Sequence, residues 1–88
     1  MAGYRGGKRM PFYYFHVQDG RDQDFEGVEL PDLEAARREA IRFAGYLIQQ
    51  VAENFFVGEL WSMQVCNKEG ARYMTLEFSV LDEPGMAA

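Results

Sequence analysis

The pattern of apolar and polar residues predicts two strands that are followed by a helix. Residues 12–18 are rich in aromatic and β-branched side chains, and the pair Asp19 and Gly20 that follows is typical of a tight turn. A second strand is expected within residues 21–30, which also hold an acidic, glycine-containing turn. From Asp32 onwards the apolar residues recur at helical spacing, so the chain changes from a strand period to a helix period at this point.

A long amphipathic helix is the most clearly signalled element. Asp32 is a natural N-cap behind Pro31, and Glu34 lies in the first turn, where the helix dipole favours a negative charge. The apolar residues that follow form a single stripe with helical periodicity. They are Leu33, Ala36, Ala40, Ala44, Leu47, Ile48, Val51 and Phe55, with Ile41 beside them. Such a helix can cover one face of a sheet, and the opposite face then has no helix packed on it.

A hairpin is predicted in the last third of the chain. Its strands are residues 59–67 and residues 71–81, and both alternate apolar and polar side chains. If Asn67 and Gly70 close the turn, Met63 lies opposite Met74. The apolar residues of both strands then share one face, because opposed residues of an antiparallel pair point the same way.

The resulting fold class is α+β, with the order β-β-α-β-β: a four-stranded antiparallel sheet with one long helix packed on one face. By strand parity Tyr13, Phe15 and Val17 face the helix. The opposite face is expected to bind a partner, because an uncovered aromatic surface is unusual for a solitary domain. The residues expected to contact that partner are Phe12, Tyr14, His16 and Tyr73.

Length and net charge limit the number of domains and the kinds of binding partner. A chain of 88 residues allows one domain, and a net charge of −5 disfavours non-specific attraction to phosphate backbones or anionic lipid. We expect the folded domain to span residues 10–83. Residues 1–9, which carry three cations and no acid, are expected to be a flexible extension, and residues 84–88 a flexible tail.

The sequence contains little that indicates a catalytic, cofactor or metal site. Cys66 is the single cysteine, which excludes an intramolecular disulfide and a Cys-rich metal site. No phosphate-binding loop, catalytic triad or metal-ligand spacing is present, so we expect no cofactor, no metal and no catalytic residues. The sequence contains no secretory signal or membrane-spanning segment, so we expect a cytoplasmic protein without membrane contact.

Two weak chemical motifs have ordinary explanations. His16 and Cys66 share a face by parity, but a nucleophile pair requires hydrogen-bond contact and an orienting group that nothing in the sequence predicts. Residues 22–27 resemble the first half of a calcium loop, yet the twelfth position is Leu33 where a bidentate glutamate is required. An inert strand cysteine and an acidic turn are the simpler interpretations.

Nucleic-acid binding is the alternative function. Aromatic strands are typical of sheets on which single-stranded RNA stacks, and residues 1–9 would add a basic arm. The RNA-recognition motif, however, has two helices and a glycine in its aromatic strand. This chain has one predicted helix, and residues 72–78 contain no glycine. The acidic net charge weakens the interpretation further.

Several segments together carry a family resemblance. They are residues 10–17 (MPFYYFHV), Asp19 with Gly20, Glu26 with Gly27, and residues 30–37 (LPDLEAAR). With these segments the chain resembles a family of short bacterial proteins of unknown function, whose members begin at the position of Met10. The resemblance implies a β-β-α-β-β domain and no established activity, so no functional residue is carried over. It also makes residues 1–9 an extension or a misassigned start.

The function expected from these observations is that of a small non-enzymatic interaction module. The predicted sheet has two faces and the chain supplies one helix, so we expect the module to self-associate as a homodimer. The contact is expected at the aromatic face or at a strand edge. A further, unidentified protein partner is left open.

Overall fold

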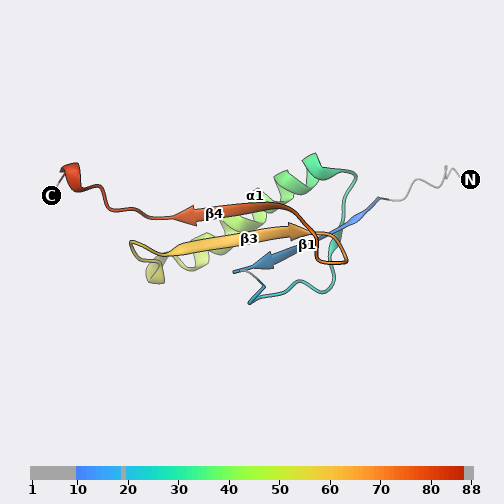
Figure 1. Cartoon of the computed structure of the whole chain (residues 1–88), viewed down its shortest axis with the longest axis horizontal. Helices are drawn as coiled ribbons and strands as arrows, with labels where there is room; N and C mark the ends of the chain where they lie inside the picture. Colours follow the sequence, from blue (N-terminus) through green and yellow to red (C-terminus); the bar gives the residue numbers. More distant parts are fainter. Residues whose placement is uncertain (1–9, 19, 87–88) are drawn as a thin grey trace, which may run out of the picture.

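A computed structural model describes residues 10–18 and 20–86 of the chain. It consists of one four-stranded antiparallel sheet with a long helix across one face (Figure 1). The elements are β1 (Phe12–Val17), β2 (Val28–Glu29), α1 (Leu33–Gln50), η2 (Ala52–Asn54), β3 (Leu60–Cys66), β4 (Arg72–Ser79) and η3 (Pro84–Met86). The strand order is β2-β1-β3-β4, which confirms the predicted α+β class.

The ends of the predicted domain are described in part. Residues 1–9, the predicted extension, lie outside the described residues, as do residues 87 and 88. Beyond β4 the chain runs away from the sheet towards η3 (Figure 1). The flexibility expected at both ends stays a prediction.

The core forms between the sheet and α1. Tyr13, Phe15 and Val17 of β1 are buried in it, as strand parity predicts. On α1 the buried residues are Ala36, Ala40 and Ala44. A row of alanines removes side-chain bulk from the contact line, so the helix backbone can lie close to the strands and larger residues fill the flanks.

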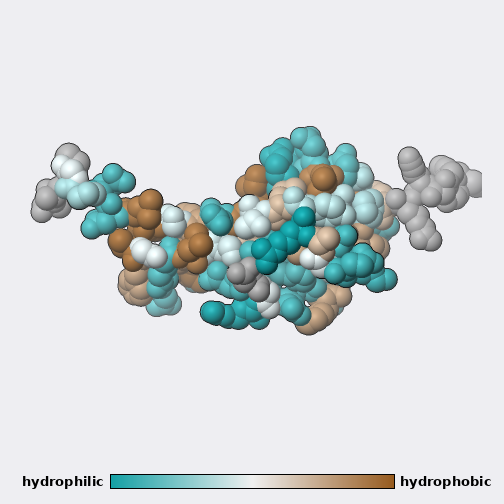
Figure 2. Space-filling view, in the orientation of Figure 1, coloured by the Kyte–Doolittle hydropathy of each residue, from teal (hydrophilic) through white to brown (hydrophobic). Residues whose placement is uncertain are grey.

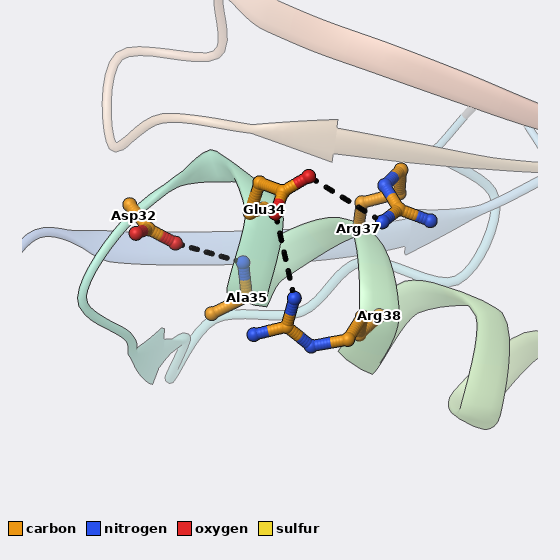
Figure 3. A network of polar contacts seen from close by, with 5 residues as sticks. All are labelled: Asp32, Glu34, Ala35, Arg37 and Arg38. Atoms are coloured by element: carbon orange, nitrogen blue, oxygen red, sulfur yellow. Dashed lines mark hydrogen bonds and ion pairs between the residues drawn. The ribbon is translucent and has the colours of Figure 1, made fainter.

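The helix begins where the sequence predicts (Figure 3). The carboxylate of Asp32 accepts a hydrogen bond from the Ala35 N–H at 2.9 Å, which satisfies one of the free donors of the first turn. Glu34 pairs with Arg37 and with Arg38, each at 3.6 Å. These exposed pairs contribute about 0–1 kcal/mol, so capping and core packing, more than surface charge, hold this end of α1.

The far end of the helix differs from the predicted stripe. Helix α1 stops at Gln50, and a short 3₁₀ turn follows, so the helical pattern does not continue to Phe55. Leu33, which belongs to the predicted stripe, and Ile41, which was expected beside it, are both exposed. Leu33 is the first residue of α1, and Ile41 lies about 100° around the helix from its neighbour Ala40, which is buried. No helix within the described residues is long and apolar enough to cross a bilayer.

The β3–β4 register was predicted wrongly. Met63 pairs with Leu76, two positions beyond the expected partner Met74. The turn is wider than expected, because the Asn67 N–H donates to the Ala71 carbonyl at 2.9 Å, and a bulge beside it shifts the ladder once more. A shift of two residues keeps side-chain parity, so the predicted apolar faces still coincide.

Strand β2 lies within the predicted range but has two residues. It pairs with Phe12 and Tyr13 at the start of β1. Further along β1, residues 22–27 take the place of a strand at this edge. We call them the acidic segment.

Candidate functional site

The sheet face that points away from α1, the outer face, has a closely packed polar centre. His16 lies opposite Gln64 across the ladder, and Tyr14 lies opposite Cys66. Gln64 and Cys66 are each 2% exposed, although α1 is on the other side. The centre of the outer face is therefore covered, whereas Phe12 towards its end is exposed and Tyr14 and His16 are half-buried.

The structure brings together three of the four predicted partner-binding residues. Phe12, Tyr14 and His16 alternate along β1 and share the outer face. The Tyr73 ring instead lies 5.4 Å from that of Tyr13, a core residue, because the bulge turns this position out of the ladder. Burial, and to a lesser extent Tyr73, raises the pKa of Tyr13. The expected position of Tyr73 on the outer face near Tyr14 and His16 is therefore wrong, and partner binding by all four residues stays a prediction.

Asp24 fastens the acidic segment to β1. Its carboxylate accepts hydrogen bonds from the backbone N–H groups of Phe15 at 3.2 Å, Glu26 at 3.1 Å and Gly27 at 3.0 Å. In the other direction the Asp24 N–H donates to Nδ1 of His16 at 3.0 Å. We call this arrangement the Asp24 junction. It gives the Phe15 N–H an acceptor beyond the two residues of β1 that pair with β2.

The Asp24 junction explains the calcium-like spacing. Both carboxylate oxygens of Asp24, the middle acid of that spacing, accept backbone N–H groups, which is the behaviour of an Asx turn. Across residues 10–18 and 20–86, no group of three or more His, Cys, Asp or Glu residues is placed to hold a metal ion.

Cys66 and His16 do not form an activated pair. Burial raises the pKa of the Cys66 thiol, and the Arg72 guanidinium opposes this effect without cancelling it. The thiol therefore stays protonated near neutral pH, whereas the thiolate is the nucleophile. Nδ1 of His16 already accepts the Asp24 N–H. The arrangement suits a structural role for both side chains.

Glycine is required at position 27 by the backbone conformation and by the neighbouring Tyr14 ring. Its φ is +74°, and a Cβ atom at this position would lie 2.7 Å from the Tyr14 ring. We expect Gly27→Ala to lower the free energy of unfolding by about 1–3 kcal/mol, measured by urea denaturation. Gly45→Ala is the control, because Gly45 lies in α1 with nothing within 4 Å of the added atom. It should stabilise the protein slightly. Equal urea midpoints for Gly27→Ala and the parent would contradict the expectation.

A groove lies between β1, the acidic segment and α1. Its volume is about 530 Å³, and its floor is apolar. Four acidic residues also line the groove, Asp24 of the junction and Asp22, Glu26 and Glu39, and we call the last three its rim. The residues of the floor are Phe15, Val17, Val28, Phe43 and Leu47. No sequence pattern indicates this groove, because its walls come from three separate parts of the chain.

The opposite edge of the sheet is formed by β4, a strand of eight residues. Exposed apolar side chains gather where β4 leaves the sheet (Figure 2). We call this group the apolar end. It consists of Phe56, Val57, Leu60, Phe78, Val80 and Leu81, each at least 36% exposed. The Gly58 N–H donates to the Val80 carbonyl at 2.9 Å, which holds the loop before β3 against the end of β4.

Comparisons with known proteins identify a family and no activity. Neither the curated proteins nor the solved structures contain a match to this chain. One family model, described as a domain of unknown function (DUF6894), matches residues 12–79. The matched region contains all four strands and α1, and it confirms the family resemblance of the sequence. The chain therefore belongs to the DUF6894 family, a domain of unknown function.

Proposed function

We propose that this protein is a self-associating module that forms a homodimer through the free edge of β4. The observation that carries the proposal is the position of β4, an eight-residue strand at the end of the sheet order. Exposed strand edges of this length are templates for pairing with another chain. The apolar end lies at the same strand and adds surface that gains from burial.

The direction of the backbone groups supports the use of this edge. The Gln18 N–H donates to the Ser62 carbonyl at 2.8 Å, so Ser62 points its backbone groups towards β1. Backbone groups of successive residues in a strand point to opposite sides, so the N–H and C=O of Met63 point towards β4. The N–H and C=O of its partner Leu76 point towards β3. The residues between the paired positions of β4 then direct N–H and C=O away from the sheet. They are Thr75, Glu77 and Ser79.

The side chains of β4 favour one register between two copies. In a two-fold arrangement centred on Leu76, Leu76 lies opposite its own copy and Met74 lies opposite Phe78. Thr75 then lies opposite Glu77. An arrangement centred on Glu77 would instead oppose two carboxylates, which is destabilising. The Leu76-centred register extends the sheet continuously from one copy to the next.

The other edge of the sheet is protected, which favours a closed dimer over a fibre. Strand β2 has two residues, and the Asp24 junction occupies the remainder of β1. Short edge strands and covering loops of this kind prevent further pairing. With one open edge per copy, pairing stops at two copies.

Thr75→Pro tests the dimer without breaking the hairpin. The outward N–H of Thr75 is lost, while the bonds of β4 to β3 do not use it, and proline is tolerated at such edge positions. Light scattering at micromolar concentration should give about 20 kDa for the parent, twice the 10.1 kDa of one chain, and one chain mass for the variant. Thr75→Val, which keeps the N–H, is the matched control and should remain a dimer. A monomeric parent, or a dimeric Thr75→Pro variant that retains the parent's circular dichroism, would overturn the proposal.

Nucleic-acid binding through the outer face has weaker support. Base stacking requires exposed rings, whereas the Tyr14 ring covers Gly27 and the Tyr73 ring lies against Tyr13. Glu77 adds a negative charge to the same face. The edge of β4 therefore remains the better candidate for the working surface.

A further inference from the structure

We propose that the groove between β1, the acidic segment and α1 binds a small organic cation: an amine with an aromatic or aliphatic body. The groove volume of about 530 Å³ lies within the range of about 300–1,000 Å³ that is typical of small-molecule sites. This site is independent of the proposed dimer, because it lies beside β1 and not at the β4 edge.

The floor of the groove suits an apolar body. The rings of Phe15 and Phe43 meet edge to face, with centroids 6.4 Å apart and planes at 88°. Phe43 is 39% exposed, so part of its ring is available to a ligand. Val17, Val28 and Leu47 complete the apolar lining. Burial of an aromatic or aliphatic group here would remove apolar area from water on both partners.

The rim selects the sign of the ligand's charge. Glu39 pairs with Arg42 at 3.4 Å and is partly neutralised. Asp22 and Glu26 take part in no ion pair within the described part of the chain. No lysine or arginine lines the groove, again among the described residues. Two uncompensated carboxylates beside an apolar floor attract a cation and repel an anion.

The wall that carries these carboxylates is held in place before any ligand arrives. The Asp24 junction ties the acidic segment to Phe15, and the Asp22 N–H donates to the Val17 carbonyl at 3.1 Å. The Val17 N–H donates back to the Asp22 carbonyl at 2.8 Å. A wall that is already ordered lowers the entropic cost of binding. The exposed part of the Phe43 ring adds an aromatic surface, with which an ammonium group can form a cation–π contact.

Three probes with the same phenyl body separate charge from shape. We would titrate the ¹⁵N-labelled full chain with 2-phenylethylamine, 2-phenylethanol and phenylacetate, and follow the amide resonances. The amine should shift the amides of the acidic segment and of Phe43 and approach saturation by about 5 mM, a millimolar affinity. We expect it to bind about tenfold more tightly than phenylacetate, with the neutral alcohol between them. The advantage should shrink as salt is added.

A charge-matched pair of variants locates the site. Asp22→Asn with Glu26→Gln removes the two unpaired rim charges and should lower the amine affinity to that of the alcohol. Glu53→Gln with Glu69→Gln removes the same total charge outside the groove and should leave the affinity within about twofold of the parent. All four residues are exposed, so both variants should fold. The proposal is overturned if phenylacetate binds as tightly as the amine, if the shifts map elsewhere, or if no probe reaches saturation.

Discussion

Replacement of Met63 by alanine is expected to lower the free energy of unfolding by about 2–5 kcal/mol. Met63 is 0% exposed and lies in β3, between β1 and β4 and beneath α1. Truncation leaves a cavity that the surrounding strands cannot close without breaking their ladders. Because small domains of this size have a thin stability margin, such a loss consumes much of the total. Urea denaturation followed by circular dichroism measures it directly.

Two further variants make the result specific to burial at this position. Met63→Leu conserves most of the volume and should cost less than about 1.5 kcal/mol. Leu60→Ala changes a residue of the same strand that is 54% exposed and should cost about 0.5 kcal/mol. Measurement of the whole set in the Thr75→Pro background, which is expected to be monomeric, keeps the proposed dimer from contributing to the free energies of unfolding. An equal loss for Met63→Ala and Leu60→Ala would show that Met63 is not at the centre of the core.

Replacement of Asp24 by alanine should also lower the free energy of unfolding. It deprives the N–H groups of Phe15, Glu26 and Gly27 of their acceptor. A buried donor left unsatisfied costs about 1–3 kcal/mol, and the partial exposure of this site places the total in the same range. Beyond the loss of stability, the Phe15 amide should exchange with solvent much faster, because its acceptor is the Asp24 side chain.

Asp24→Asn is the matched control for this change. The asparagine keeps a side-chain oxygen and the shape of the turn, so part of the protection of the Phe15 amide should survive. Hydrogen exchange measured by NMR distinguishes the two variants residue by residue. If the Phe15 amide exchanges equally in the parent and in Asp24→Ala, the junction does not hold the acidic segment to β1.

Elements that depend on local chemistry were predictable. Asp32 caps α1 because the capping bond to Ala35 spans three residues and needs no distant partner. The burial of Tyr13 and Phe15 follows from the two-residue period of a strand. Both are properties of a short stretch of chain, and both agree with the structure.

Elements that depend on distant chain segments were not predictable to the same degree. The pairing of Met63 with Leu76 depends on a bulge and a wider turn, and neither changes the apolar pattern from which the register was predicted. The same bulge places Tyr73 against Tyr13. The spacing of Asp24 and Gly27 suggested an acidic turn. The hydrogen bond from the Phe15 N–H to the Asp24 carboxylate, nine residues later, has no signal in the sequence.

By itself the sequence determined the α+β class, the helix start, the parity of β1 and the family. These follow from periodicity and from local hydrogen bonds, which the order of residues encodes directly. The tertiary structure alone decided the β3–β4 register, the free edge of β4 and the groove beside β1. Each of these arises where segments far apart in the chain meet, because backbone groups and apolar surface must then find partners across space.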